Sequence, residues 1–287
     1  MKRIGVLSVL MLFLVFAGVT PQAHASTIDM ASVSGLSATT LGNIIFTNSI
    51  GVVNVGTGNF DPFLTLSDTN QHGTNFTKDG LEEAYNTSGR IGADAPMDAD
   101  STASREKDVL LSTVPVFNIG GTDYYEFLLD INQSGSAGGE LLSLNDVHLY
   151  LGTSGGAIVQ TRSALDSLYP ALVYDLSADT YDNGGGATTI DYVALNAGLT
   201  SGSGGGVVDL GMYVPKSYFV GYDPATTYLI LYTQFGVPEQ ANDGFEEWGV
   251  RITSTPPPPP EVPEPASLVL LGVGLAGAAF RRRRVRK

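Results

Sequence analysis

The clearest strand in the sequence is Asp123-Tyr124-Tyr125-Glu126-Phe127-Leu128-Leu129-Asp130-Ile131. Every second residue of a strand points to the same face. One face of this stretch would carry Tyr125, Phe127, Leu129 and Ile131, and the other would carry Tyr124, Glu126, Leu128 and Asp130. A wholly apolar face beside a mixed one is typical of a strand that lies against a hydrophobic core. We therefore expect an all-β fold that includes residues 123–131 as a central strand.

Similar alternating segments occur on both sides of this strand. They cover residues 43–48, 52–55, 144–151, 208–214 and 228–232, and turn residues such as Gly120-Gly121 and Gly155-Gly156 separate them. The segment 144–151 is the expected partner of 123–131, and its alternation slips at Asn145-Asp146, which predicts an irregularity there. Helical patterns are confined to 79–85 and 163–168, the first of them inside a long polar loop expected over 67–108.

These features predict one antiparallel β-sandwich over residues 26–255, jelly-roll-like or immunoglobulin-like, with roughly a dozen strands. Further short helices are expected at each terminus, in the targeting segments described below. A parallel β-helix is the alternative fold, but no internal repeat of fixed period supports it.

The charge of the chain is unevenly distributed. The net charge is −14, but all 29 acidic residues lie between Asp29 and Glu264, where only seven basic residues occur. Residues 26–265 therefore carry a net charge of −22. Such a surface repels nucleic acids and anionic lipid headgroups, so we exclude both as partners. The chain has no cysteine, which excludes disulfides, thiol catalysis and cysteine-ligated metals.

The N-terminus has the pattern of a secretory signal peptide. Lys2 and Arg3 precede an apolar stretch over residues 4–19, and Ala23-His24-Ala25 gives the small-x-small motif that signal peptidase cleaves. We expect cleavage after Ala25. A transmembrane helix is the less favoured interpretation because Pro21 and polar residues follow the apolar stretch.

The C-terminus combines four features in order. Five prolines (256–260) begin a stiff spacer, and Val262-Pro263-Glu264-Pro265, an uncharged apolar segment (266–280) and a basic tail follow it. The basic residues of the tail are Arg281, Arg282, Arg283, Arg284, Arg286 and Lys287. As a helix the apolar segment would span roughly 22 Å, against about 30 Å of bilayer hydrocarbon. The tail would keep the C-terminus in the cytoplasm. A permanent membrane anchor is one interpretation, and a transient anchor held for processing is the other.

Residues 262–287 resemble the PEP-CTERM sorting signal of exported bacterial proteins. The resemblance implies that Pro263, Glu264 and Pro265 form a recognition motif, near which a membrane-embedded cysteine protease, an exosortase, removes the tail. It also implies a Gram-negative host that makes extracellular polysaccharide. The protein would thus be exported, held briefly in the inner membrane, and then released to the cell surface or beyond it.

Two segments are candidate calcium sites. Asp130, Asn132 and Ser134 occupy alternate positions before Gly135, as in the first half of an EF-hand loop, although Glu140 falls one place early for its twelfth ligand. Asp179, Asp182 and Asn183 precede three glycines. For both segments a polar turn that binds no ion is the favoured alternative.

The only tryptophan, Trp248, follows Glu246 and Glu247. It is a candidate for stacking on a sugar, and the alternative is a core position at the start of the last strand. Adjacent residues of a strand point to opposite faces, so the two glutamates cannot by themselves form the opposed pair of a glycosidase. His72 and His148 lie in no recognisable catalytic motif. We therefore expect a non-catalytic surface or matrix protein associated with extracellular polysaccharide, and the alternative is a carbohydrate-binding or carbohydrate-cleaving module.

Overall fold

The computed structural model describes residues 26–50, 53, 59–67, 81–89, 97–100, 104–135, 138–182, 184, 186–200 and 207–252. The predicted signal peptide with Ala23 and Ala25, the spacer (256–262), the sorting segment (263–287) and two individual residues, His72 and Asn183, lie outside these ranges. Within the ranges, the helices are all too short or too polar to span a bilayer.

The described residues form fifteen strands, one α-helix and four 3-10 helices. In chain order these are β1 (Ser26–Asp29), β2 (Ser37–Thr39), β3 (Ile45–Thr47), β4 (Phe60–Leu66), β5 (Glu82–Tyr85), β6 (Val109–Leu110), η1 (Leu111–Thr113), β7 (Val116–Ile119), β8 (Thr122–Asp130), β9 (Leu141–Gly152), α1 (Arg162–Leu168), β10 (Ala171–Asp175), η2 (Leu176–Ala178), β11 (Thr180–Asp182), β12 (Ala187–Asn196), η3 (Ala197–Leu199), β13 (Leu210–Pro215), η4 (Lys216–Phe219), β14 (Tyr228–Phe235) and β15 (Glu246–Arg251).

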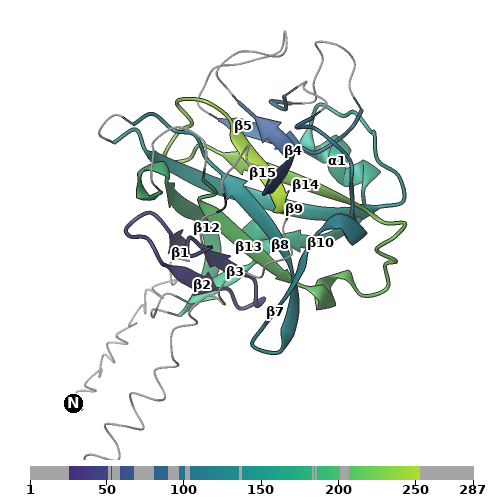
Figure 1. Ribbon diagram of the computed structural model, residues 1–287, viewed down its shortest axis with the longest axis horizontal. Helices are drawn as coiled ribbons and strands as arrows, with labels where there is room; N and C mark the ends of the chain where they lie inside the picture. Colours follow the sequence, from purple (N-terminus) through teal and green to yellow (C-terminus); the bar gives the residue numbers. More distant parts are fainter. Residues whose placement is uncertain are drawn as a thin grey trace, which may run out of the picture.

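Two sheets pack against each other to form the predicted all-β sandwich (Figure 1). The larger sheet has the order β1-β12-β9-β14-β5, with β10 beside β9, β11 beside β12 and β6 beside β14. The smaller sheet has the order β2-β3-β13-β8-β15-β4, with β7 beside β8. The ladders are antiparallel as predicted, with the exception that β1 runs parallel to β12. These two strands are far apart in the chain, so no tight turn imposes the antiparallel direction on them.

The chain crosses repeatedly between the two sheets. The consecutive strands β8 and β9 lie in opposite sheets, as do β12 and β13, β13 and β14, and β14 and β15. The central ladders of the two sheets therefore match. In the smaller sheet β8 pairs with β13 and β15, and in the larger sheet β9 pairs with β12 and β14, the strands that precede β13 and β15 in the chain. This wiring favours the jelly-roll-like alternative. It also corrects the expected pairing of 144–151 with 123–131, because β9 crosses to the opposite sheet.

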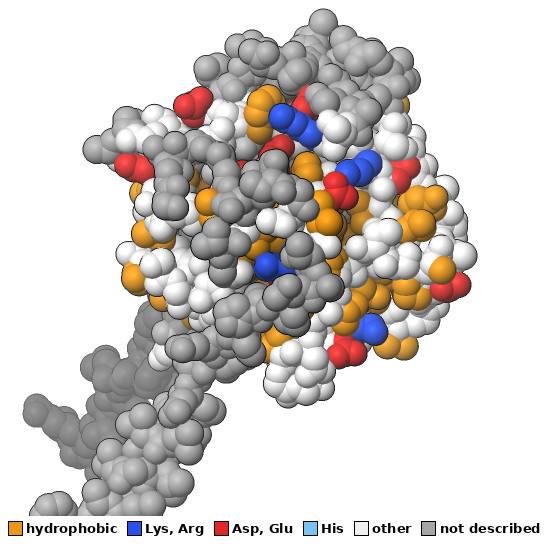
Figure 2. Space-filling view, in the orientation of Figure 1, with side chains coloured by type: hydrophobic (Ala, Val, Ile, Leu, Met, Phe, Trp, Pro, Cys, Tyr) orange, Lys and Arg blue, Asp and Glu red, His pale blue; other side chains and the backbone are white. Residues whose placement is uncertain are grey.

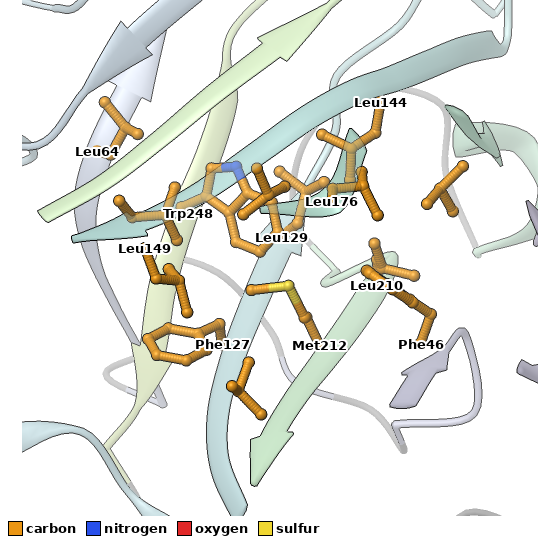
Figure 3. Close-up of a cluster of buried hydrophobic side chains, with 14 of the residues drawn as sticks. Phe46, Leu64, Phe127, Leu129, Leu144, Leu149, Leu176, Leu210, Met212 and Trp248 are labelled. Carbon is orange, nitrogen blue, oxygen red and sulfur yellow. The ribbon is translucent and has the colours of Figure 1, made fainter. Parts of the chain in front are cut away.

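The main core lies between the sheets and explains the sequence alternation. The inward residues of β8 are Tyr125, Phe127 and Leu129, which are buried with the inward residues of β9, β13 and β14. Figure 3 shows side chains from both sheets converging in this layer, among them Phe127, Leu149, Met212 and Trp248. At about 25 cal/mol per Å² of buried apolar area, this layer is the main source of stability in a chain without disulfides.

The second face of β8 is also buried. Tyr124 and Leu128 belong to a smaller apolar cluster on the outer side of the smaller sheet, together with Phe60 and Tyr213. Glu126 lies among them and is fully buried, where both of its carboxylate oxygens accept hydrogen bonds from Arg251 at 3.0 Å. The mixed face of this strand is therefore covered, and the charge of Glu126 is paired.

Two local expectations are confirmed and one is wrong. The register of β9 against β14 shifts between Leu144 and Asp146, so Asn145 is the extra residue of a bulge. The helix expected at 163–168 is α1, whose N-cap Thr161 accepts a hydrogen bond from the backbone of Ala164. The helix expected at 79–85 is wrong, since residues 82–85 form β5, which pairs with β14. Sheet pairing and the burial of Glu82, Ala84 and Tyr85 override the local helical pattern there.

Candidate functional site

A polar cluster surrounds His148 on the outer face of the larger sheet. In β9, Val147 and Leu149 point into the main core, so the residues between and beside them point outward. Asp146, His148 and Tyr150 thereby share one face of the strand. The side chain of His148 has 0% exposure, which is unusual for a polar residue on an outer sheet face.

Two carboxylates face the same ring nitrogen of His148. Its Nε2 lies 2.8 Å from Oδ2 of Asp146 and 3.4 Å from Oδ1 of Asp175. Asp175 is the cross-strand partner of His148 on β10. The other ring nitrogen, Nδ1, lies 3.2 Å from Oη of Tyr150 and 3.3 Å from Nη2 of Arg162. Because a guanidinium can only donate, Nδ1 is the acceptor and the proton lies on Nε2, which donates to Oδ2 of Asp146.

Helix α1 supplies the cover of this cluster. Nη1 of Arg162 donates to Oδ2 of Asp146 at 2.9 Å, and its guanidinium lies over the ring of Tyr232. Oδ1 of Asp166, one turn along α1, accepts a hydrogen bond of 2.5 Å from Tyr150. Burial, and next the hydrogen bond to Asp166, raise the pKa of Tyr150 and keep its hydroxyl protonated. Helix α1 therefore closes the site with one cation and one further carboxylate.

The chemistry of this cluster favours cation binding over catalysis. Asp146, His148 and Asp175 are the only three acidic or histidine residues in the described part of the chain that each offer a ligand atom within 4.8 Å of the other two. An imidazole and two carboxylates are a common ligand set for divalent metals. A general base would need a substrate within hydrogen-bond reach, and this imidazole is fully buried beneath α1.

Sequence reasoning missed this cluster, although part of the signal was visible. Asp146-x-His148-x-Tyr150 places three polar groups on one side of a strand whose other side is apolar. That pattern predicts a polar outer face. The contribution of Asp175 and Arg162 depends on how β10 and α1 pack on β9, which the sequence does not reveal.

A second group of buried acids lies between the sheets at one end of the sandwich. Glu246 of β15 is fully buried, and its carboxyl group is hydrogen-bonded to that of Glu82 of β5. Nε2 of Gln133 donates to Oε1 of Glu246 at 2.5 Å. Burial, and next the charge of Glu82, raise the pKa of Glu246 well above its usual range. These two carboxyls touch and are inaccessible, so they lack the separation that glycoside hydrolysis requires.

The predicted position of the glutamates is confirmed, and sugar stacking by Trp248 is wrong. Glu246 points inward, whereas Glu247 is on the other face and accepts a hydrogen bond from the hydroxyl of Thr65. Trp248 points inward like Glu246 and has 0% exposure. It lies in the main core, with Leu129 as its cross-strand partner (Figure 3). A ring without exposed surface cannot stack on a saccharide.

The first predicted calcium segment follows the end of β8. Asp130 is buried opposite Glu247 of β15. The backbone N–H of Ser134 donates to Asn242, and the side chain of Asn132 lies beside Gly244. The segment is therefore held against the loop that precedes β15. Calcium binding by Asp130, Asn132 and Ser134 stays a prediction.

The second predicted segment forms turns of a recognisable kind. Both oxygens of Asp179 accept hydrogen bonds, from the hydroxyl of Thr40 at 2.5 Å and from the backbone of Thr180 at 2.7 Å. Oδ1 of Asp182 accepts from the backbone N–H groups of Gly184 and Gly186. These contacts provide a structural role for both aspartates as turn acceptors. Calcium binding there also stays a prediction.

One cleft of about 300 Å³ lies beside the end of β9. Its lining includes Gly152, Thr153, Ser154, Tyr169 and Tyr222. Tyr222 is 39% exposed, which distinguishes it from the buried Tyr124 and Trp248. The cleft thus combines an exposed aromatic ring with hydroxyl groups, a combination that suits saccharides.

On the face drawn in Figure 2, Lys and Arg side chains are few, and most of them lie next to Asp or Glu side chains. Ion pairs account for this arrangement: Lys107 lies 2.5 Å from Asp61, and Arg105 lies 3.8 Å from Glu247. The Lys and Arg side chains in the described part of the domain are thus used in local pairs, which leaves the acidic excess predicted from the sequence.

Comparison with known proteins gives one similarity. Residues 261–284 match the PEP-CTERM protein-sorting motif, which confirms the resemblance seen in the sequence. No curated protein and no solved structure is significantly similar to the chain. The matched motif supports an exported protein that is sorted by an exosortase.

Proposed function

We propose that the protein is a non-catalytic component of the cell surface or extracellular matrix, delivered there by two-ended processing. The observation that carries this proposal is the PEP-CTERM motif at residues 261–284. Signal peptidase would remove residues 1–25, and the exosortase would then remove the C-terminal segment after recognising Pro263, Glu264 and Pro265. The acidic sandwich would be the product that stays outside the inner membrane.

Removal of the C-terminal segment is tested by changing the sorting motif. Replacing Pro263, Glu264 and Pro265 together by alanine should leave the tail uncleaved and the protein in the membrane fraction. Pro258→Ala is the matched control, because it changes the same tail outside the motif. Normal release of the triple variant would contradict recognition of this motif.

We further propose that the released domain associates with extracellular polysaccharide. Its net charge of −22 over residues 26–265 favours hydration and disfavours membranes and nucleic acids. Calcium could bridge such an acidic surface to an acidic polysaccharide. Co-sedimentation of the secreted protein with the host polysaccharide, with and without a chelator, tests this association. Protein that remains in the supernatant in both cases would contradict it.

A carbohydrate-binding module is the second candidate, and the cleft beside Tyr222 favours it. Stacking of a sugar on Tyr222 predicts that Tyr222→Ala loses retention on gels that contain the polysaccharide. Tyr192→Ala is a suitable control, because Tyr192 lies on β12, near the opposite end of β9 from the cleft. Equal retention of both variants would exclude the cleft as the binding site.

A further inference from the structure

We propose that Asp146, His148 and Asp175 form a three-ligand site for a divalent transition metal, of which Zn²⁺ is the representative. The ligands come from the neighbouring strands β9 and β10, and their donor atoms already converge, with Nε2 of His148 at 2.8 Å and 3.4 Å from the two carboxylates. An ion at about 2.0 to 2.2 Å from each atom would replace the proton that Nε2 now carries.

An unsatisfied acceptor supports the proposal independently of this convergence. Oδ1 of Asp146 is buried and has no hydrogen-bond partner, and the whole side chain is only 9% exposed. A buried carboxylate oxygen without a partner is unfavourable, because it has lost its hydration. Oδ2 is the oxygen that faces His148, so a cation bound by both carboxylate oxygens of Asp146 would also satisfy Oδ1.

The charges around His148 would be balanced by a dication. Asp146, Asp166 and Asp175 contribute three negative charges, and Arg162 contributes one positive charge. With a neutral imidazole, the cluster has two uncompensated negative charges. Asp146 is buried and Asp175 is 24% exposed, whereas Asp166 is 44% exposed. A divalent cation would neutralise two of these charges, and pairing of this kind is what a buried carboxylate such as Asp146 usually requires.

The contacts behind the ring suit a metal ligand. A metal-binding histidine generally donates its second N–H to a neighbouring acceptor. When a metal takes Nε2, the ring proton moves to Nδ1, which lies 3.2 Å from Oη of Tyr150. Tyr150 in turn donates to Asp166. Arg162, which now donates to Nδ1, is 36% exposed and lies 3.8 Å from Asp166, so it has an alternative partner.

The ligand set also predicts the kind of metal. Imidazole is a good ligand for Zn²⁺ and similar ions, whereas Ca²⁺ and Mg²⁺ prefer oxygen ligands alone. The site is therefore distinct from the calcium segments predicted at residues 130–134 and 179–182. Because β9 and β10 supply the ligands, the ion would link these two strands of the larger sheet.

The direct test is titration of the untagged full-length chain, purified in detergent and stripped with a chelator, with ZnCl₂ by calorimetry. We expect one site that persists in excess Ca²⁺ and Mg²⁺. Asp146→Asn and Asp175→Asn should each weaken it by about tenfold or more. Asp175→Asn keeps the Oδ1 that accepts from Ala178, so the local turn is preserved. Asp191→Asn, an exposed carboxylate on β12, is the matched control and should bind normally.

A measurement on the unchanged protein covers the case in which a variant fails to fold. In ¹⁵N spectra of its histidines, His148 should change from the Nε2–H to the Nδ1–H tautomer when Zn²⁺ is added. Zinc that binds only weakly and is displaced by Ca²⁺, or a spectrum of His148 that zinc leaves unchanged, would overturn the proposal.

Discussion

At the residue scale, buried acids control how stability depends on pH. Asp209 accepts hydrogen bonds from the hydroxyl of Thr200 at 2.6 Å and from the backbone of Ile131 at 2.9 Å. These contacts lower its pKa, but burial has the larger effect and raises the pKa from 3.8 to about 7. The contribution of Asp209 to stability is therefore fully present below about pH 4 and is lost as the pH rises through about 7.

We predict that Asp209→Asn removes this loss. Asparagine can still accept from Ile131, and its amide can donate to the hydroxyl of Thr200. Between pH 4 and pH 7.5, the free energy of unfolding should decrease more for the parent than for the variant. The difference between the two decreases should be on the order of 4 kcal/mol. Urea unfolding at several pH values measures the difference, and parallel pH profiles would contradict the prediction.

Glu246 should behave in the same direction. Its pKa is raised by burial and then by Glu82, so ionisation as the pH rises destabilises the folded state. Glu246→Gln removes one of the two acids and keeps an oxygen that can accept from Gln133. We expect the variant to gain stability relative to the parent at pH 8 and to show no such gain at pH 4. Thermal unfolding at the two pH values tests this, and an equal difference at both would contradict it.

The individual residues show what alternation can and cannot predict. Opposite faces for Glu246 and Glu247 follow from strand geometry alone, and the structure confirms them. The contact of Glu246 with Glu82 could not be predicted, because it joins strands from opposite sheets. The same limit applies to His148, whose partner Asp175 depends on the register of β10.

At the element scale, α1 depends on its N-cap. The side chain of Thr161 accepts a hydrogen bond from Ala164 at 3.3 Å, and the helix holds Arg162 over the His148 cluster. Thr161→Ala should reduce the free energy of unfolding by about 1 kcal/mol. Ser167→Ala, an exposed change within the helix whose hydroxyl contacts the backbone carbonyl of Ser163 and not the cap, is the control and should be nearly neutral. Urea unfolding of both variants measures the effect, and equal losses would contradict a specific cap.

The elements themselves were predictable where a local pattern is strong. The bulge at Asn145 and the helix at 162–168 were both visible, because each rests on a local signal. The error at 82–85 has a physical cause. Asn86, which follows β5, bonds to the backbone of Leu229 and Leu231 of β14, a contact more than 140 residues away in sequence. Such tertiary contacts decide the structure of a segment whose local preference is weak.

At the scale of the whole molecule, the fold and the export of the protein are predicted from separate parts of the sequence. The all-β class follows from segments such as 123–131, whereas the wiring of the sheets and the parallel β1·β12 ladder depend on contacts distant in sequence. The sorting motif at 261–284 is recognisable without any structure. The central claim is that this motif delivers an acidic sandwich to the outside of the inner membrane.

The most direct test of that claim is the intact mass of the protein recovered from its host, in both membrane and extracellular fractions. We predict an extracellular product that begins near Ser26 and ends near Pro265. A protein confined to membranes that still carries residues 281–287 would contradict the claim and would identify the tail as a permanent anchor.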